Sequence, residues 1–266
     1  MLDIGRRLSN HFLEVQYDGD GFVYLMVHSG SRNIGLKIGD YFSKVALEMN
    51  QKWHSEGREL EIPFLPVETE EGQSYLAWLS FALDFALLNR QLMLQEAMKC
   101  ISNEFPEVKI TTWEIVTKTV DGILNINHNY TSLEQVYNQN LWVHRKGAVL
   151  CRNNYGIVPG SMQTKSFITK SLNNPKSIYS CSHGSGRKMS RTAFNIKMKN
   201  SHAQIEKSLE GIVHSKFQKN TRGKAKGLLD VSEIGEAYKD VESVMENQKD
   251  LVEKVVELKP MISLKG

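Results

Sequence analysis

The chain has 266 residues, 41% of them hydrophobic and 24% charged, an ordinary globular composition that excludes a fibrous or low-complexity protein. Its formal charge of +3 permits an anionic partner such as RNA without requiring one. The three cysteines are an odd number and form no CxxC pair. Such a set is a poor disulfide framework and favours a reducing, cytoplasmic compartment.

The N-terminal residues show no cationic stretch followed by an apolar core, so we expect no signal peptide. The most apolar stretch, SYLAWLSFALDFALLNRQLML, is interrupted by Asp84 and Arg90. Its uncharged part is too short to span a bilayer. We therefore interpret it as a buried helix.

The first half of the chain predicts a hairpin followed by two helices. The runs HFLEVQY and FVYLMVHSG alternate like strands around the turn DGDG, and the second strand is expected to end at His28. After the turn SGSRNIG, apolar spacing predicts a helix from about Asp40 to Trp53. A loop with two prolines separates it from a long helix over about Ser74 to Cys100.

The second half predicts strands followed by helices. Residues 108–130 and the run WVHRKGAVL have strand patterns, and YSCSHGSGRKMSR is expected to contain a strand end, a glycine turn and a helix start. The C-terminal third is expected to be helical, with a basic stretch KFQKNTRGKAKG and a final helix over about Asp240 to Leu258. This order favours one α+β domain over residues 1–266.

Four histidines lie where a predicted strand meets a turn: His11, His28, His128 and His183. Imidazole is a common ligand of transition metals, and such positions hold side chains toward a cleft. No two of them form a compact motif such as HExxH. Spacing alone therefore leaves two interpretations open, which are metal ligands and hydrogen-bonded turn residues.

Three glycine turns combine Gly, Ser and a cation: HSGSRNIG, PGSMQTKS and SHGSGRKMSR. Such loops can present backbone N–H groups and hydroxyls to phosphate oxygens. None is a Walker A or GxGxxG sequence. The alternative is that they are simply tight turns.

His183 is followed by Arg187 and Arg191 at intervals of four residues. If a helix starts at the turn, both arginines share its face. Nearby arginines favour a neutral, nucleophilic imidazole and can hold a phosphoryl group. The alternative is a basic, solvated helix face.

The chain resembles the RtcB family of RNA-splicing ligases. The resemblance lies in a series of short runs in one order, from about residue 8 to residue 266: NHFLEV, VHSGSRNIG, HNY, HRKGA, PGSM, SHGSGRKMSR, EAYKDVESVM and LKG. It implies an enzyme that uses GTP and two manganese ions in tRNA splicing or RNA repair. Such an enzyme joins an RNA 3′-phosphate or 2′,3′-cyclic phosphate to a 5′-hydroxyl through a histidine–GMP intermediate.

The resemblance also implies roles for individual residues. His183 matches the guanylylated nucleophile, and His11, His28 and His128 match the metal ligands. The residues expected in the nucleotide pocket are Asn10, Phe12, Glu14, Ser161, Ser166, Arg187 and Lys265, with Lys265 on the guanine. The residues expected near phosphate or RNA are Arg32, Lys146 and Arg191.

One departure concerns a DxGCG-type segment, whose Asp and Cys are metal ligands in the family. It lies upstream of the NHF motif and is not in this sequence. The resemblance therefore implies an RtcB-like domain that is N-terminally truncated and corresponds to the C-terminal two-thirds of a full member. The alternatives are a catalytically incomplete nucleotide- or RNA-binding remnant, and one subunit of a split ligase whose partner is a separate N-terminal subunit.

Overall fold

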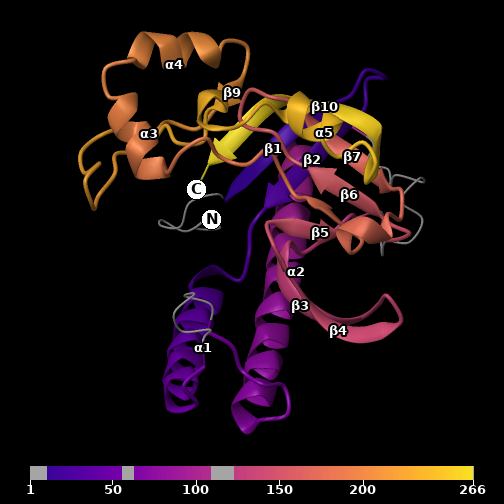
Figure 1. Ribbon diagram of the computed structural model, residues 1–266. Helices are drawn as coiled ribbons and strands as arrows, with labels where there is room; N and C mark the ends of the chain where they lie inside the picture. Colours follow the sequence, from indigo (N-terminus) through magenta and orange to yellow (C-terminus); the bar gives the residue numbers. More distant parts are fainter. Residues whose placement is uncertain (1–10, 56–62, 109–122, 266) are drawn as a thin grey trace. The chain divides into compact units, whose positions relative to one another are not determined.

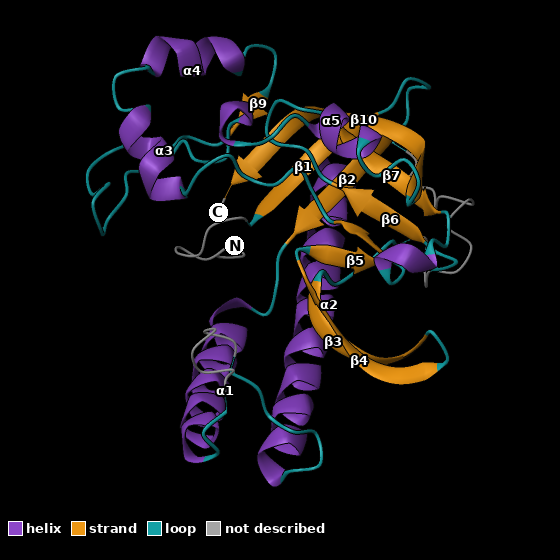
Figure 2. Cartoon of the chain, viewed as in Figure 1, coloured by secondary structure: helices purple, strands orange, loops and turns teal. Residues whose placement is uncertain are grey.

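The computed structural model describes residues 11–55, 63–108 and 123–265, and the predicted α+β class is confirmed. Contacts divide the chain into two compact units, residues 29–100 and the remainder. Figure 2 shows that the strands belong to the larger unit, whereas the smaller one is helical. No helix among the described residues is long and apolar enough to cross a membrane. The assignment of residues 1–266 to one domain stays a prediction.

The larger unit is built on a six-stranded sheet in which β10 is central, between β1 and β7 (Figure 1). The sheet order is β2-β1-β10-β7-β6 with antiparallel neighbours, and β9 pairs with β10 in parallel. The strands are β1 (Phe12–Tyr17), β2 (Val23–His28), β6 (Tyr155–Val158), β7 (Ser166–Ser171), β9 (Val213–His214) and β10 (Val252–Lys265).

The remaining elements of the larger unit are two small hairpins and several short helices. The strand pairs are β3 (Asn129–Val136) with β4 (Gln139–Lys146), and β5 (Ala148–Leu150) with β8 (Ser180–Ser182). The short helices are η4 (Pro175–Ser177), α3 (Arg191–Lys197), α4 (His202–Ser208), η5 (Gly235–Ala237) and α5 (Val241–Glu246).

The predicted final helix from Asp240 to Leu258 is wrong, because its second half is a strand. Helix α5 ends at Glu246, and β10 begins at Val252. The first part of β10 pairs with β7 and the last part with β1, so partners distant in sequence override the local helical spacing. Pro260 fits the strand because it lies at an irregularity of the ladder, where it faces Gln16.

Other local predictions are confirmed or corrected. The first hairpin forms as predicted, with Tyr17 facing Val23. The turn is held by Asp18, whose carboxylate accepts from the backbone N–H groups of Asp20 and Phe22 at 2.9 and 3.0 Å. Strands were predicted over residues 108–130, of which residues 109–122 lie outside the described part. Residues 123–128 have no regular structure, and Asn129 and Tyr130 belong to β3.

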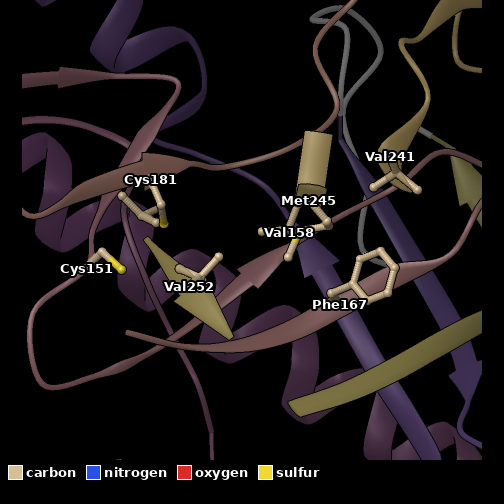
Figure 3. Packing of buried hydrophobic residues seen from close by; sticks show 8 residues of the cluster. Cys151, Val158, Phe167, Cys181, Val241, Met245 and Val252 are labelled. Atoms are coloured by element: carbon tan, nitrogen blue, oxygen red, sulfur yellow. The ribbon is translucent and has the colours of Figure 1, made fainter. Parts of the chain in front are cut away.

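Residues of β6, β7, β10 and α5, with others from β5 and β8, form a hydrophobic core (Figure 3). Phe167 and Val158 are fully buried, and Met245 of α5 packs on them with Val252. This core includes Cys181, which lies two residues before His183. The segment that carries His183 is therefore anchored by packing.

The smaller unit contains α1 (Arg32–Lys52) and most of α2 (Glu70–Glu104). Both helices start earlier than predicted, so part of the predicted turn SGSRNIG is helical. The buried amide of Asn50 accepts from the backbone N–H of Phe64 at 2.9 Å and donates to its carbonyl at 2.8 Å. This pair of bonds ties the end of α1 to the segment that precedes α2.

Candidate active site

Three adjacent strands bring Phe12, His28 and Lys265 into one row. In the sheet register, Phe12 of β1 faces His28 of β2 on one side and Lys265 of β10 on the other. The Phe12 and His28 rings stack with centroids 5.1 Å apart, and the Lys265 ammonium lies 4.3 Å from the centroid of the Phe12 ring. Cross-strand neighbours on one face of a sheet lie within contact distance, so the pairing itself builds this row.

Glu14 lies two residues along β1, is 2% exposed, and is held by hydrogen bonds. Its carboxylate accepts from Ser263 Oγ at 2.9 Å and from Gln16 Nε2 at 2.8 Å, and lies 4.0 Å from the Lys265 ammonium. Burial raises the pKa of Glu14, with Lys265 opposing this, and burial lowers the pKa of Lys265. Both side chains are therefore shielded from water, and the charge of each one affects the pKa of the other.

Three histidines converge beside this row. The ligand atoms of His28, His128 and His183 all lie within 4.8 Å of one another. The Nε2 atoms of His28 and His128 are 3.0 Å apart, and the rings of His128 and His183 stack with centroids at 3.8 Å. The structure therefore brings together two of the three predicted metal ligands and the predicted nucleophile.

Backbone hydrogen bonds around Gly147 position two of these histidines. The His183 N–H donates to the Gly147 carbonyl at 3.3 Å, and the Ala148 N–H donates to the His128 carbonyl at 3.3 Å. Gly147 has a φ of 64°, a conformation that favours glycine. The glycine of the HRKGA run is thus where the chain turns from β4 into β5 beneath His183.

A cavity of about 210 Å³ opens beside His183 within the larger unit. Its wall combines aromatic, cationic and acidic side chains with the glycine turn after His183. The lining residues include Phe12, Glu14, His28, Ser161, His183, Ser185, Arg187, Arg191, Glu233, Tyr238 and Lys265. The buried Ser185 Oγ and Arg187 Nη2 have no hydrogen-bond partner among the described residues, so a polar ligand can satisfy them.

Glu233 joins the two arginines of the cavity. Its Oε1 accepts from Arg187 Nη1 at 3.3 Å and from Arg191 Nε at 3.0 Å, while its Oε2 accepts from the Tyr238 hydroxyl. Arg187 also donates to the Ser232 carbonyl at 2.7 Å. Burial, followed by the charge of Glu233, raises the pKa of Tyr238, so its hydroxyl stays protonated.

The strand end and the helix start predicted within YSCSHGSGRKMSR are confirmed, but the helix does not start at the glycine turn itself. Helix α3 begins only at Arg191, so Arg187 and Arg191 do not share a helix face. Arg187 instead forms an isolated bridge with Tyr238, in which the Lys188 N–H donates to Ala237 and the Lys239 N–H to Gly186. The two arginines meet through Glu233.

The two predicted pocket serines lie in the turn after β6 and at the start of β7. Ser161 lines the cavity, whereas Ser166 is fully buried, and its Oγ accepts from Gln16 Nε2 and from the Gly160 N–H, each at 3.1 Å. A Cβ at Gly160 would lie 2.1 Å from the Lys165 carbonyl oxygen, so only glycine permits this turn.

The structure does not assign several predicted site residues to the cavity or to the histidine group, and their roles stay predictions. His11 does not belong to the three-histidine group, and Asn10 lies outside the described residues. Arg32 starts α1 in the smaller unit. Lys146 is exposed at the end of β4, next to Gly147.

Glu233 and Tyr238 were not predicted as site residues. Tyr238 lies in the run EAYKDVESVM, which contributes to the family resemblance but predicted no role for any of its side chains. Their function as cavity walls depends on pairing with residues 186–188, which local sequence patterns do not reveal.

The larger unit thus has a cavity lined by cations and carboxylates, beside a histidine group, on an α+β fold. A family model described as tRNA-splicing ligase RtcB matches residues 8–266, and the chain belongs to the RtcB family. It is 36% identical over 258 residues to the RNA-splicing ligase RtcB of Escherichia coli, covering 97% of this chain and 59% of the relative.

Two further relatives give the same coverage of this chain. The tRNA-splicing ligase RtcB of Methanococcus maripaludis is 29% identical over 293 residues, with 97% of this chain and 58% of the relative covered. The RNA-splicing ligase RtcB2 of Escherichia coli is 29% identical over 273 residues, with 97% and 63% covered. The chain spans about three-fifths of the length of the relatives that it matches.

Proposed function

We propose that this protein is an RNA ligase that uses GTP and manganese to join an RNA 3′-phosphate or 2′,3′-cyclic phosphate to a 5′-hydroxyl. The observation that carries the proposal is the position of His183, which borders both the histidine group and the cation-lined cavity. The relatives' names, which describe RNA-splicing and tRNA-splicing ligases, support the reaction class. The three cysteines are free thiols, which fits a reducing cytoplasm.

The residues of the histidine group fit a transition-metal ion. Two imidazole nitrogens at about 2.1 Å from one ion lie about 3 Å apart as adjacent ligands of an octahedral site, and about 3.4 Å apart in a tetrahedral one. His28 and His128 Nε2 are 3.0 Å apart. We assign these two side chains, with His11 from the sequence prediction, as the protein's imidazole ligands. A manganese ion bound there would neutralise part of the negative charge of the triphosphate.

His183 is suited to act as the nucleophile. Burial lowers its pKa, so the imidazole is neutral near pH 7 and one ring nitrogen keeps its lone pair. That nitrogen forms a bond to the α-phosphorus of GTP while the bond to the β-phosphate oxygen breaks and pyrophosphate leaves. The GMP then passes to the RNA 3′-phosphate, which frees His183, and attack by the 5′-hydroxyl releases GMP. A cyclic phosphate is hydrolysed first.

The cavity's charges suit a nucleotide. Arg187, Arg191 and Lys265 outnumber the carboxylates of Glu14 and Glu233, so an anion is favoured there. Arg187 holds its position through Ser232 and Glu233, which leaves Nη2 for a phosphate oxygen. A cation of the cavity would thus lie near the bond that forms at His183.

Incubation with α-labelled GTP and manganese tests the proposal. We expect covalent label on the protein, stable to alkali and released by acid as a phosphorus–nitrogen bond requires. Addition of RNA with 3′-phosphate and 5′-hydroxyl ends should then remove the label and yield a sealed strand. Label without sealing would favour the nucleotide-binding alternative, and absence of both would refute the proposal.

Replacing Lys265 with methionine should reduce the preference for GTP over ATP by about 1–3 kcal/mol, the scale on which a cation distinguishes bases. The ammonium can donate to guanine O6 and N7, whereas adenine presents an amino donor in place of O6. Methionine keeps an apolar stem over Phe12. Competition binding with both nucleotides measures the change, and Lys259→Met on the exposed part of β10 is the control. Unchanged selectivity would show that guanine is recognised elsewhere.

A further inference from the structure

A strongly cationic hairpin, residues 216–230, lies outside the cavity. Its five cations, all exposed, are Lys216, Lys219, Arg222, Lys224 and Lys226. No Asp or Glu occurs from residue 211 to residue 229. The whole chain has 33 Lys and Arg against 30 Asp and Glu, so the chain without this hairpin is slightly acidic. The excess positive charge of the protein is therefore concentrated here.

The hairpin has a fixed backbone. Lys219 and Leu229 form an antiparallel bridge, the Asn220 N–H donates to the Leu228 carbonyl at 2.8 Å, and the Gly227 N–H donates to the Asn220 carbonyl at 2.8 Å. Ala225 is 3% exposed at its turn. Phe217 packs against a core cluster of the larger unit. The cations are thus presented on an ordered scaffold and not on a free loop.

The N-terminal root of the hairpin is joined to the strand that carries Lys265. Strand β9 pairs with Ile262 and Ser263 of β10. The next residue, Ser215, donates its N–H to the Ser263 carbonyl at 3.2 Å, and its Oγ accepts from the Lys265 N–H at 3.0 Å. Lys216 therefore follows directly on a residue that is bonded to the cavity wall.

The C-terminal root is joined to the part of the wall that carries Arg187 and Arg191. Asp230, which accepts from Asn195 Nδ2 at 3.0 Å, is followed by the buried Val231. Next come Ser232, whose carbonyl accepts from Arg187, and Glu233, which joins the two arginines. Both ends of the cationic hairpin are consequently rooted in the walls of the cavity beside His183.

The five cations form no ion pair with a carboxylate in the part of the chain that the structure describes. Like charges that are clustered without counter-ions repel one another, and a polyanion removes this repulsion while it releases its own counter-ions. The nine residues from Ser215 to Gly223 reach at most about 30 Å, which is long enough to follow several phosphates.

We propose that this hairpin binds the sugar–phosphate backbone of the RNA whose 3′-phosphate end occupies the cavity. The hairpin does not recognise particular bases, because exposed lysines contact phosphates without distinguishing the nucleotide sequence. The proposal rests on the proposed RNA-ligase function and adds the surface that holds the substrate strand. An acidic protein is the other partner that such charge suits, but the attachment of both roots to the cavity favours the substrate strand.

The test compares two variants that lose the same charge. In the hairpin variant, the five hairpin cations are replaced with glutamine. In the dispersed variant, glutamine replaces five exposed lysines elsewhere: Lys37, Lys44, Lys52, Lys170 and Lys176. Binding of a single-stranded RNA oligonucleotide with a 3′-phosphate is measured by fluorescence anisotropy over a series of salt concentrations. Thermal unfolding reports folding, and a variant with only Arg222, Lys224 and Lys226 replaced serves if the full variant unfolds.

We expect the hairpin variant to bind this RNA about ten-fold more weakly or worse, with a smaller salt dependence. Each lost phosphate contact lowers the slope of log affinity against log salt by about 0.7 for a single strand. The dispersed variant should keep most of the affinity and slope. An equal loss of RNA affinity in both variants would overturn the proposal. So would unchanged RNA affinity in the hairpin variant, and that result would favour an acidic protein as the partner.

Covalent labelling by GTP separates this proposal from the proposed function. Both variants should label as the unaltered protein does, because the replaced side chains lie outside the cavity. Absence of label in the unaltered protein would count against the ligase function itself. Normal label together with unchanged RNA binding in the hairpin variant would count against the hairpin alone.

Discussion

Replacement of His183 with alanine should lower covalent labelling by GTP at least about 10³-fold, since loss of a covalent nucleophile is among the largest single effects in catalysis. The fold should survive, because the backbone N–H of His183 keeps its bond to the Gly147 carbonyl and the preceding Cys181 stays in the core. Labelled protein is counted after denaturation, and circular dichroism reports the fold.

Two comparisons distinguish a nucleophile from a metal ligand within the histidine group. His128→Ala should also reduce labelling, but higher manganese concentrations should restore part of it, because one ligand of several is missing. His183→Ala should not respond to added manganese. His202→Ala, at the exposed start of α4, is the control histidine and should label normally. Label that persists in His183→Ala would place the covalent site on another residue.

Local signals were sufficient for the first hairpin but not for the last strand. The DGDG turn contains its own stabilising contacts, because Asp18 bonds to residues two and four positions away. Strand β10, in contrast, is determined by β1 and β7, whose residues lie far away in the sequence. The apolar residues of β10 are compatible with a helix or a strand, and pairing with β1 and β7 stabilises the strand.

The candidate site shows the same division. The motifs selected histidines and cations that lie beside recognisable turns, and the structure brings His28, His128 and His183 together. Their convergence could not be read from spacing: His28, His128 and His183 approach one another only when three separate sheets are assembled. Glu233 had no local signal at all, since its importance comes from Arg187 and Arg191, more than forty residues away.

Glu134 is expected to be a major determinant of stability near the histidine group. It pairs with Arg145, which is 3% exposed, across the β3–β4 hairpin, and Arg145 Nη2 donates to Glu134 Oε2 at 2.9 Å. Arg145 also donates from Nε to Ser180 Oγ at 3.0 Å and from Nη2 to the Ile178 carbonyl at 3.1 Å. The buried guanidinium therefore links this hairpin to β8, which leads to His183.

Glu134→Ala should lower the free energy of unfolding by about 3–5 kcal/mol at pH 7, because it leaves the Arg145 charge buried and uncompensated. Glu96→Ala removes an exposed pair with Lys99 and should cost no more than about 1 kcal/mol. Urea unfolding measures both. Equal costs for the two variants would show that the buried pair is not required.

The same pair predicts a pH dependence. The hydrogen bonds from Arg145 hold the pKa of Glu134 below its ordinary value of 4.5. A carboxylate whose pKa is lower in the folded state contributes stability above its unfolded pKa, and this contribution is lost as the pH falls through the folded pKa. Acidification from pH 7 to below 4 should therefore destabilise the unaltered protein more than Glu134→Ala, so the difference between them narrows. A difference that stays constant over this range would mean that the variant's cost comes from lost packing and not from the ionised carboxylate.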